Sequence, residues 1–457
     1  MPAEEGNASM RNHRSMDYEQ AIAYLLSFAD FERSGRFSTR TDLAPMQRLL
    51  REVGDPQLGR LTVHIAGSKG KGSVAAMISS ILKECGLKVG TFISPHLHSF
   101  RERIQIDGNP IGRDDFAALA GELPPAVEQV KAAFPKRELV TFDLFTAMAF
   151  MRFRRTHVDV QVMETGLGGR LDSTNALEKK EVCVITPIGL EHTNILGDTV
   201  EQIAGEKAGI ITPGAVVVMA AQPEPAAAVI RSAGCRQGAR LVETGAICRV
   251  ERLGHDLDGQ DFRLETDVRT YELRLPLLGR HQLENAATAV VAVESLAPYG
   301  VQVGPEEVRR GLAGVRWPGR LEVIERRPLL VLDGAHSAEA ARRLRETLLE
   351  DFSFSRCVLV AGLSKDKNAA AFAAELTALK PSVIAVRASH PRSAPASDVA
   401  AAFAALDAPT LILEDVRAAV DAARGLAEPD DLICVTGSLF VVAEARAYLL
   451  GIEEHGA

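Results

Sequence analysis

The stretch LTVHIAGSKGKGSVAAM, residues 61–77, indicates how the rest of the chain is organised. Its apolar start at 61–66 predicts a buried strand, and a turn with three glycines leads into a helical pattern. Glycine lets a backbone approach a polyphosphate closely, a helix N-terminus attracts negative charge, and a lysine adds a mobile cation. We therefore expect a phosphate-binding loop formed by Gly67, Ser68, Lys69, Gly70, Lys71, Gly72 and Ser73.

This loop departs from the general nucleotide-binding pattern G-x-x-x-x-G-K-[ST] at two positions. Ile65 stands where the first glycine is required, and Gly72 stands where the pattern has Ser or Thr. Ser73 comes one place late. A plain glycine-rich turn between a strand and a helix therefore stays open as an alternative, and other residues must decide which enzyme the loop serves.

The composition is that of an ordinary globular protein. The 457 residues, 46% hydrophobic and 25% charged, are enough for two or three domains. A formal net charge of -8 argues against broad nucleic-acid binding, which needs a basic surface. The N-terminus lacks the apolar core of a signal peptide, and no apolar run approaches the roughly 18 residues of a membrane span. The six cysteines include no C-x-x-C pair, so we expect reduced thiols in a cytoplasmic protein.

The pattern of the sequence divides the chain into regions. Residues 1–16 are polar, and we expect a disordered tail there. From 17 to 316, strands and helices alternate, and the runs at 261–267 and 271–277 predict a small antiparallel sheet. From 317 to 457, a plain alternation of strands and helices predicts a parallel sheet with helices on both faces. The expected fold class is α/β, with an N-terminal P-loop ATPase-like domain and a C-terminal Rossmann-like domain.

Polar residues follow the predicted strands of the first domain. Ser94 and His96 come after the second strand, Glu164 after the next, and His192 after a later one. Ligands collect at the carboxyl ends of strands in open α/β sheets, so these residues should gather near Lys71. Mg²⁺ prefers hard oxygen ligands and keeps waters and phosphates in its shell. Ser94 and Glu164 suit a magnesium–ATP site, whereas His192 is a less usual ligand.

Each of these residues also has a plainer interpretation when taken alone. Glu164 could cap the turn that follows its strand, and His192 could be an ordinary loop histidine. Lys207 beside Glu206 is typical of a solvated helix face, and Asp333 before a glycine is typical of a turn. Their joint order along the chain, rather than any one of them, carries the functional information.

Eight motifs occur in this order: HIAGSKGKGS, SPHL with ERI, METGLGGRLDSTN, GLEHTNILGDTVEQIAGEKAGI, RHQLENAATA, WPGRLE, LDGAH and VTGSLF. Together they resemble the folylpolyglutamate synthase and dihydrofolate synthase family of the Mur ligase superfamily, over nearly the whole chain. The resemblance implies an enzyme that phosphorylates a carboxylate with ATP, giving an acyl phosphate that the amine of L-glutamate attacks. The implied carboxylate substrate is dihydropteroate or a reduced folate.

The resemblance also implies roles for single residues. Two Mg²⁺ ions would be held by Ser94, Glu164 and His192, with Lys207 as a further ligand if its amine is carbamylated. ATP would contact the phosphate-binding loop and Asn285, Arg320 and Asp333, in a cleft between the domains. Catalysis would rest on Lys71, Glu164, His192 and Lys207. The substrate contacts would be Thr141, Phe142, Asp143, Leu171, Asp172 and Ser173 for the pterin, and His336 and Ser438 for glutamate.

Three other functions stay open: another Mur-type amide ligase, a P-loop switch that binds nucleotide to signal, and a scaffold with a decayed site. The pterin-like segments favour the folate-linked ligase over other Mur-type ligases. A switch predicts nucleotide binding without glutamate-dependent phosphate release. A decayed site is disfavoured, because Lys71, Ser94, Glu164 and His192 are all present. We expect a monomer whose C-terminal domain closes over the site.

Overall fold

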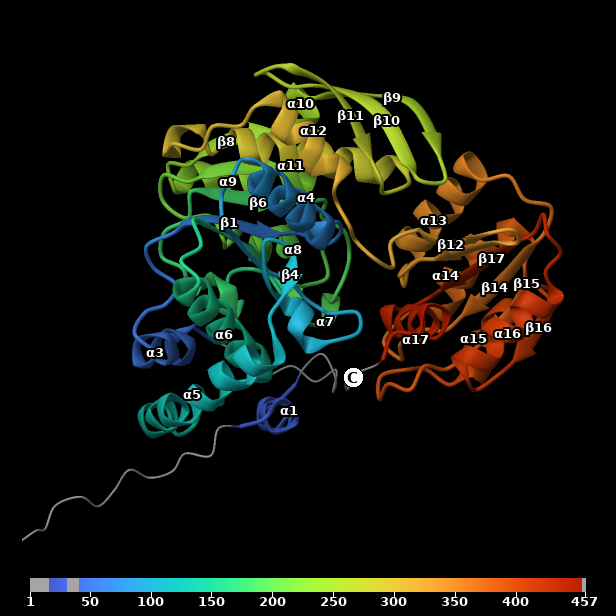
Figure 1. Cartoon of the computed structure of the whole chain (residues 1–457), viewed down its shortest axis with the longest axis horizontal. Coiled ribbons are helices and arrows are strands. Elements are labelled where there is room, and N and C mark those ends of the chain that lie inside the picture. The colour runs from blue at the N-terminus through green and yellow to red at the C-terminus, as the bar shows by residue number, and fades with distance from the viewer. Residues whose placement is uncertain (1–15, 31–40, 454–457) are drawn as a thin grey trace, which may run out of the picture.

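The computed structural model of the chain describes residues 16–30 and 41–453. The tail expected at 1–16 therefore lies outside the described residues, except for its last one. Figure 1 shows two lobes, and each lobe is built around its own sheet with helices on both faces. The expected two-domain α/β fold is confirmed, while the division between residues 316 and 317 stays a prediction.

The N-terminal lobe contains an eight-stranded sheet in the order β4-β3-β2-β5-β1-β6-β7-β8. The strand that leads into the phosphate-binding loop, β1, lies in its interior between β5 and β6, and pairs with both in parallel. At one edge of this sheet, β3 pairs antiparallel with both β2 and β4. The strands are β1 Leu61–Ala66, β2 Val89–Phe92, β3 Ile104–Ile106, β4 Asn109–Pro110, β5 Val160–Glu164, β6 Val182–Ile185, β7 Val216–Met219 and β8 Arg240–Glu243.

Helices cover both faces of this sheet, because its parallel strands carry apolar side chains on either side. One face packs against α4 Lys71–Glu84, α11 Arg280–Glu294 and α12 Pro305–Ala313. The other face packs against two groups of helices: α1 Tyr18–Leu26, α3 Ala44–Glu52, α5 Arg113–Ala133 and α6 Thr141–Arg155, and then α8 Val200–Ala208 and α9 Glu224–Arg236. The shorter elements are η1 Phe100–Arg103, η2 Ser173–Ala176, α7 Thr193–Leu196, α10 Thr244–Ile247 and η3 Ala297–Tyr299.

A three-stranded antiparallel sheet adjoins the first lobe, in the order β11-β10-β9. Two of its strands, β10 Gly259–Glu265 and β11 Thr270–Leu275, are the alternating runs that the sequence predicts. The third, β9 Arg249–Asp256, has no buried residue and therefore shows no clear apolar alternation. This lack of an apolar face explains why sequence inspection overlooked it.

The C-terminal lobe contains a six-stranded sheet in the order β12-β13-β17-β14-β15-β16. Five strands are parallel, as predicted, and β12 forms an antiparallel edge that pairs with β13. Sequence inspection did not predict this edge. The strands are β12 Glu322–Arg326, β13 Leu329–Leu332, β14 Cys357–Ala361, β15 Ser382–Ala385, β16 Thr410–Ile412 and β17 Leu432–Thr436. The helices are α13 Ala338–Asp351, α14 Ala369–Leu376, η4 Thr377–Leu379, α15 Ala396–Ala404, α16 Val416–Leu426 and α17 Leu439–Leu450.

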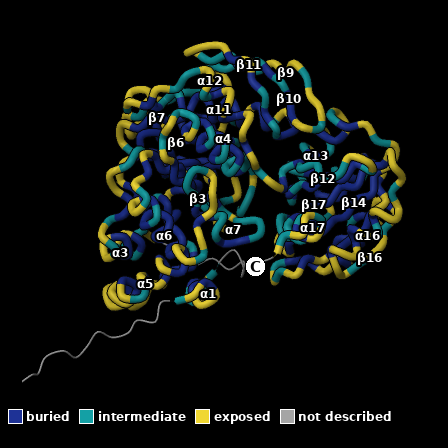
Figure 2. The backbone as a smooth tube through the Cα atoms, viewed as in Figure 1, coloured by how far each residue is buried: buried dark blue, intermediate teal, exposed yellow. Residues whose placement is uncertain are grey.

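Burial separates the sheets from their helical cover. Figure 2 shows buried strands at the centre of both lobes and exposed turns of α5 at the outer surface. The helix α17 lies on the side of its lobe that faces the N-terminal lobe (Figure 1). Among the described helices, none is both long and apolar enough to cross a membrane.

The carboxyl ends of β1, β5 and β6 and the start of α17 meet at the junction of the lobes.

Candidate active site

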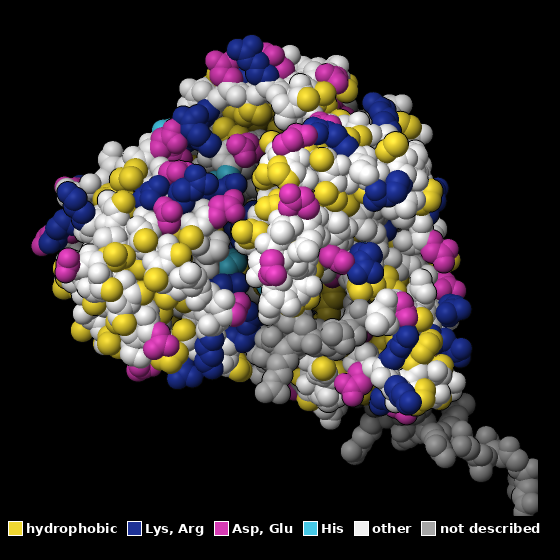
Figure 3. All heavy atoms as spheres, turned by 180° about the vertical axis from the view of Figure 1, so that it is seen from behind, with side chains coloured by type: hydrophobic (Ala, Val, Ile, Leu, Met, Phe, Trp, Pro, Cys, Tyr) yellow, Lys and Arg dark blue, Asp and Glu magenta, His cyan; other side chains and the backbone are white. Residues whose placement is uncertain are grey.

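A cavity of about 850 Å³ lies at this junction and is lined by residues of both lobes. In the space-filling view, histidine and basic side chains lie in the furrow between the lobes (Figure 3). Nearly all of the predicted site residues line the cavity, and they come from segments as distant as 68–73 and 438–444. Two of them, Gly67 and Asp143, are outside the set of described residues that form its wall. The structure therefore brings the predicted residues together around one cavity, with these two exceptions, while the role of each residue stays a prediction.

The phosphate-binding loop has the tight geometry that its glycines permit. Gly70 has a φ of 82° and precedes the first residue of α4, so it occupies a conformation that favours glycine. A Cβ atom at Gly70 would lie 2.5 Å from Asn285 Oδ1. A Cβ at Gly72 would lie 2.5 Å from Cζ2 of Trp317. The loop therefore packs directly against Asn285 and Trp317, which bring α11 and the interlobe linker to the same place.

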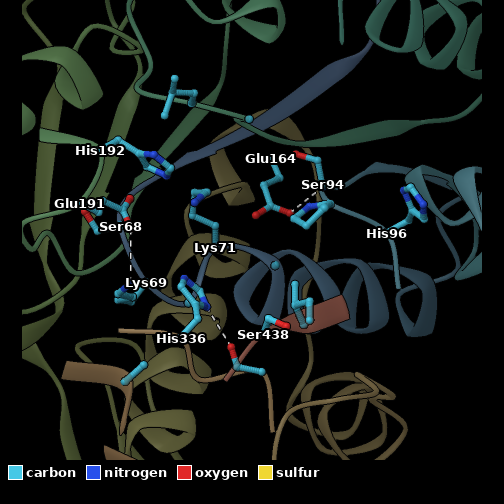
Figure 4. Close-up of a pocket in the computed structure, with 18 of the residues that line it drawn as sticks. Ser68, Lys69, Lys71, Ser94, His96, Glu164, Glu191, His192, His336 and Ser438 are labelled. Carbon is cyan, nitrogen blue, oxygen red and sulfur yellow. Dashed lines mark hydrogen bonds and ion pairs between the residues drawn. The ribbon is translucent and has the colours of Figure 1, made fainter. Parts of the chain in front are cut away.

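The N-terminal end of α4 opens into the cavity with Lys71 as its first residue. The first N–H groups of a helix have no partner within the helix, and together with the helix dipole they attract an anion. In Figure 4, Lys71 lies between Glu164 and His192, and His336 is drawn below Lys71. The turn therefore has the features that a phosphate cradle needs, and binding of phosphate stays a prediction.

A buried cluster of charges supports the loop from below. Lys207 is 2% exposed, and its Nζ donates to Gly67 O at 2.7 Å and pairs with Glu191 Oε1 at 3.2 Å. Lys69 Nζ reaches the other oxygen of Glu191 at 3.5 Å. The interpretation of Lys207 as part of a solvated helix face is therefore wrong. Gly67, whose carbonyl accepts this bond, is not among the described residues that line the cavity.

Burial and charge shift the pKa values of this cluster. Burial lowers the pKa of Lys207 to about 8, with Glu191 opposing the shift. For Glu191, burial would raise the pKa, but Lys207, Lys71 and Lys69 outweigh it and lower the pKa to about 2. Glu191 is thus a carboxylate at neutral pH. Sequence inspection quoted Glu191 within its motif but gave it no role, because nothing local shows that three lysines converge on it.

Ser94 and Glu164 lie together at the ends of adjacent strands β2 and β5. The N–H group of Ser94 donates to Glu164 Oε2 at 3.3 Å, and both residues line the cavity (Figure 4). A carboxylate and a hydroxyl oxygen beside a phosphate cradle are suitable donors for Mg²⁺. The described residues include no group of three or more His, Cys, Asp or Glu arranged to hold a metal. Mg²⁺ can bind through one or two protein oxygens, because phosphates and waters complete its shell.

His192 stands at the start of α7 with a φ of 49°, an unusual conformation for a residue other than glycine. Burial lowers its pKa to about 4, although Glu191 opposes the shift. The imidazole is therefore neutral at physiological pH, as a metal ligand must be. His192 is therefore a neutral, largely buried imidazole that lines the cavity, and its role as a metal ligand stays a prediction.

The second lobe contributes Arg320 and Asp333. Asp333 accepts hydrogen bonds from Leu321 N at 2.9 Å and Ala335 N at 2.8 Å, so it organises the turn after β13 as well as facing the cavity. Burial raises the pKa of Asp333, and Arg320 opposes this shift. Burial lowers the pKa of Arg320, while Asp333 and Glu164 oppose it. Arg320 thus lies within the electrostatic reach of carboxylates from both lobes.

The predicted pterin segments line another part of the cavity. Phe142 at the start of α6 packs against Gly166, where a Cβ would lie 2.6 Å from Phe142 Cζ. Asp172 accepts a hydrogen bond from Leu167 N at 2.9 Å and caps η2. The remaining predicted residues that line this part are Thr141, Leu171 and Ser173. These contacts give the glycine-rich turn a fixed shape.

Asp143 differs from the others because it lies behind this wall. Its Oδ2 accepts from Val140 N at 2.9 Å, and its Oδ1 accepts from Ser173 Oγ at 2.6 Å. Asp143 therefore joins the start of α6 to η2. Thr141 is partly occupied as well, since its hydroxyl donates to Leu25 O at 3.0 Å.

The two residues predicted for glutamate, His336 and Ser438, line the cavity from the C-terminal lobe. His336 Nδ1 lies 2.9 Å from Gly334 O, and burial lowers the pKa of its imidazole to about 3. A neutral ring next to a carbonyl must donate from Nδ1, which leaves Nε2 as an acceptor. Ser438 caps α17 by accepting from Val441 N at 3.2 Å.

Two parts of the chain match known domain families. Residues 125–293 match the Mur ligase middle domain, and residues 319–439 match the Mur ligase, glutamate ligase domain. The fold and the site together therefore define a protein of the Mur ligase class.

More similar proteins narrow this class. The chain is 35% identical over 424 residues to a dihydrofolate synthase/folylpolyglutamate synthase of Bacillus subtilis. The match covers 91% of this chain and 96% of that protein. It is 36% identical over 436 residues, or 94% of its length, to a probable bifunctional folylpolyglutamate synthase/dihydropteroate synthase of Haloferax volcanii, of which it spans 50%. A structure of Mycobacterium tuberculosis folylpolyglutamate synthase complexed with ADP and AMPPCP has a TM-score of 0.86 and 34% identity, and the match covers 95% and 100% of the two chains. The chain belongs to the folylpolyglutamate synthase/dihydrofolate synthase family.

Proposed function

We propose that this protein is an ATP-dependent ligase that joins L-glutamate to the carboxylate of dihydropteroate or of a reduced folate. The observation that carries the proposal is the single cavity in which Lys71 and the start of α4 face Glu164 from one lobe and Arg320 from the other. Membership of the folylpolyglutamate synthase/dihydrofolate synthase family supports the same chemistry.

The reaction requires activation of a poor electrophile. A carboxylate oxygen attacks the γ-phosphate of ATP, ADP leaves, and the acyl phosphate is then attacked by the neutral amine of glutamate, which forms an amide and releases phosphate. Phosphoryl transfer depends mainly on positioning and on neutralising charge. Lys71, the N-terminal N–H groups of α4 and Arg320 supply positive charge to the phosphates. Closure of the second lobe over the first would exclude water, which protects the acyl phosphate from hydrolysis.

Ser94, Glu164 and His192 would hold Mg²⁺ in this site, as two ions if both predicted positions are used. The metal would neutralise charge on the phosphates. These donors fit because Ser94 and Glu164 are in contact and because His192 is neutral at physiological pH.

Lys207 is proposed as a carbamylated lysine that supplies a further oxygen ligand. Carbamylation joins the neutral amine to carbon dioxide and releases a proton. The lowered pKa of Lys207 increases the fraction of neutral amine. The existing contacts of its Nζ with Gly67 O and Glu191 would have to rearrange when the group becomes an anion.

The remaining proposed roles follow the predicted assignment. ATP contacts the phosphate-binding loop, Asn285, Arg320 and Asp333, and the pterin lies along the 141–142 and 171–173 segments. Glutamate binds near His336 and Ser438. We also propose that the enzyme works as a monomer in the cytoplasm.

One assay tests this function. Release of ADP is measured with ATP, Mg²⁺ and L-glutamate, in parallel reactions with dihydropteroate and with tetrahydrofolate, and the products are analysed by mass. We expect ADP release that depends on glutamate and a mass gain of one glutamyl residue per turnover. Nucleotide binding without glutamate-dependent ADP release would indicate a nucleotide switch. Activity with neither pterin would exclude the proposed substrates.

A further inference from the structure

The loop formed by residues 94–99, here called the Ser94 loop, reaches from the N-terminal lobe to the C-terminal lobe. Its Leu97 packs against an apolar cluster of the C-terminal lobe that includes Val441, Val442 and Ala445 of α17. A Cβ at Gly319 would lie 3.0 Å from Val442 Cγ1 and 3.7 Å from Leu97 Cδ1. The interlobe linker, α17 and the Ser94 loop thus meet at one point.

A polar contact reinforces this meeting point. Arg446 Nη1 of α17 lies 3.1 Å from Nε2 of His98. A guanidinium can only donate, so Nε2 of His98 is the acceptor in this contact. Arg446 Nε also donates to both oxygens of Glu322 in β12, at 3.0 and 2.9 Å. Glu322 in turn accepts from Gly319 N at 2.8 Å, directly before Arg320.

A single carboxylate, that of Glu102, binds the backbone of the second half of the Ser94 loop. Glu102 accepts hydrogen bonds from the N–H groups of Leu97, His98 and Ser99, at 2.8, 2.8 and 2.7 Å. At the other end of the loop, Ser94 N donates to Glu164. Hydrogen bonds therefore hold both ends of the loop, and only three residues separate Ser94 from His98.

Burial makes this connection more than a surface ion pair. The side chains of Arg446 and Glu322 are 16% and 23% exposed, so solvent screens their interaction less than it screens a pair on the open surface. Arg446 is outside the set of described residues that line the cavity, and it therefore acts only through its neighbours. The separation of 348 positions between His98 and Arg446 shows that the contact joins the two lobes.

We infer that Arg446 is a positioning residue that couples docking of the C-terminal lobe to the placement of Ser94 and Arg320 on the two sides of the nucleotide site. When the lobe docks, Nη1 of Arg446 contacts His98 and so holds the Ser94 loop. Nε of the same guanidinium contacts Glu322 and so holds the linker. Ser94, the oxygen donor of one lobe, and Arg320, the cation of the other, then reach their working positions together. The consequence for catalysis rests on the proposed function, whereas the coupling itself does not.

The test compares Arg446→Ala, Arg446→Lys, His98→Ala and the double variant with Tyr448→Phe as the matched control. Tyr448 lies on the same helix and is 37% exposed, and its hydroxyl bonds Asp421 of α16 at 2.8 Å rather than the other lobe. Backbone amide exchange at 97–99 is measured by mass spectrometry without substrates. Turnover and the KM for ATP are measured in the ADP-release assay.

We expect exchange at 97–99 to become about tenfold faster in Arg446→Ala and in His98→Ala, with no further increase in the double variant, because the two residues act through one contact. Turnover should fall about tenfold in both, which is the usual size of such coupling. Arg446→Lys should recover part of the turnover, because an ammonium can contact one partner but not fork between both. Tyr448→Phe should leave exchange and turnover unchanged.

The two readouts separate failure of this inference from failure of the proposed function. Wild-type exchange at 97–99 in Arg446→Ala would overturn the coupling, whatever the enzyme catalyses. Additive effects of the two substitutions would also overturn it, because independent sites do not share a contact. Altered exchange in a protein that shows no ligase activity would uphold the coupling and reject the proposed function.

Discussion

Replacing Lys71 with alanine is the most direct test of the phosphate-binding loop. Lys71 is the first residue of α4, it lines the cavity, and its charge helps to keep Glu191 ionised and His192 neutral. The ammonium group is proposed to face charge that develops on the transferred phosphate. Removing one preorganised donor of this kind lowers turnover by about 10²–10³, or roughly 2.7–4 kcal/mol of transition-state stabilisation. We expect a loss of this size in Lys71→Ala.

The fold should withstand this change, because the apolar side of α4 carries the packing. Val74, Ile78 and Ile81 are buried in the main core of the lobe and are untouched by the substitution. The matched control is Lys83→Ala, which removes an exposed lysine from the last turn of the same helix, roughly 18 Å away at 1.5 Å per residue. Turnover is measured by ADP release and stability by thermal unfolding. Near-normal turnover in a folded Lys71→Ala protein would refute the assignment, as would an equal loss in Lys83→Ala.

Four further changes have defined expectations. Glu164→Ala should lower turnover by about 10²–10³ and weaken the Mg²⁺ dependence of ATP binding measured by calorimetry, since it removes a charged oxygen donor. Lys207→Ala should abolish any dependence of activity on added bicarbonate, and a wild-type protein without an added carboxyl mass on Lys207 would exclude the carbamate. Gly70→Ala should cost about 1–2 kcal/mol of stability for its left-handed backbone and weaken ATP binding by displacing Asn285, seen as a lower unfolding temperature and a higher Kd. Burial lowers the pKa of His64 well below 6.5, so the unfolded chain takes up a proton at a higher pH than the folded protein does. The free energy of unfolding therefore falls as the pH drops below 6.5. His64→Leu should reduce this fall by up to about 1.4 kcal/mol per pH unit, measured by denaturant unfolding between pH 7.5 and 5.

Local signals in the sequence were sufficient for much of the fold. The strand, glycine turn and helix around Lys71 are encoded within seventeen consecutive residues, and the C-terminal alternation reports helices and strands directly. Strands without an apolar pattern were missed. The exposed β9 is one example, and β12 is another, because its residues are only partly buried at the edge of a sheet.

The candidate site divides in the same way. The gathering of Ser94, Glu164 and His192 was predictable because they lie at or beyond the carboxyl ends of strands, and these ends share one edge of a parallel sheet. The orientation of a side chain was not predictable in this way. Asp143 sits in the predicted pterin segment but turns toward Ser173 and Val140, and the carbonyl of Gly67 turns toward Lys207.

The sequence by itself determined the glycine-rich turn between a strand and a helix, the α/β class of both lobes and the residues available to the site, because short-range periodicity and glycine positions encode these properties. Only the tertiary structure decided that Glu191 joins Lys69 and Lys207 beneath the loop, and that Arg446 joins His98 to Glu322 across the lobes. The physical reason is that these contacts depend on packing between segments far apart in the chain, and the identity of a residue does not state which distant partner it will meet.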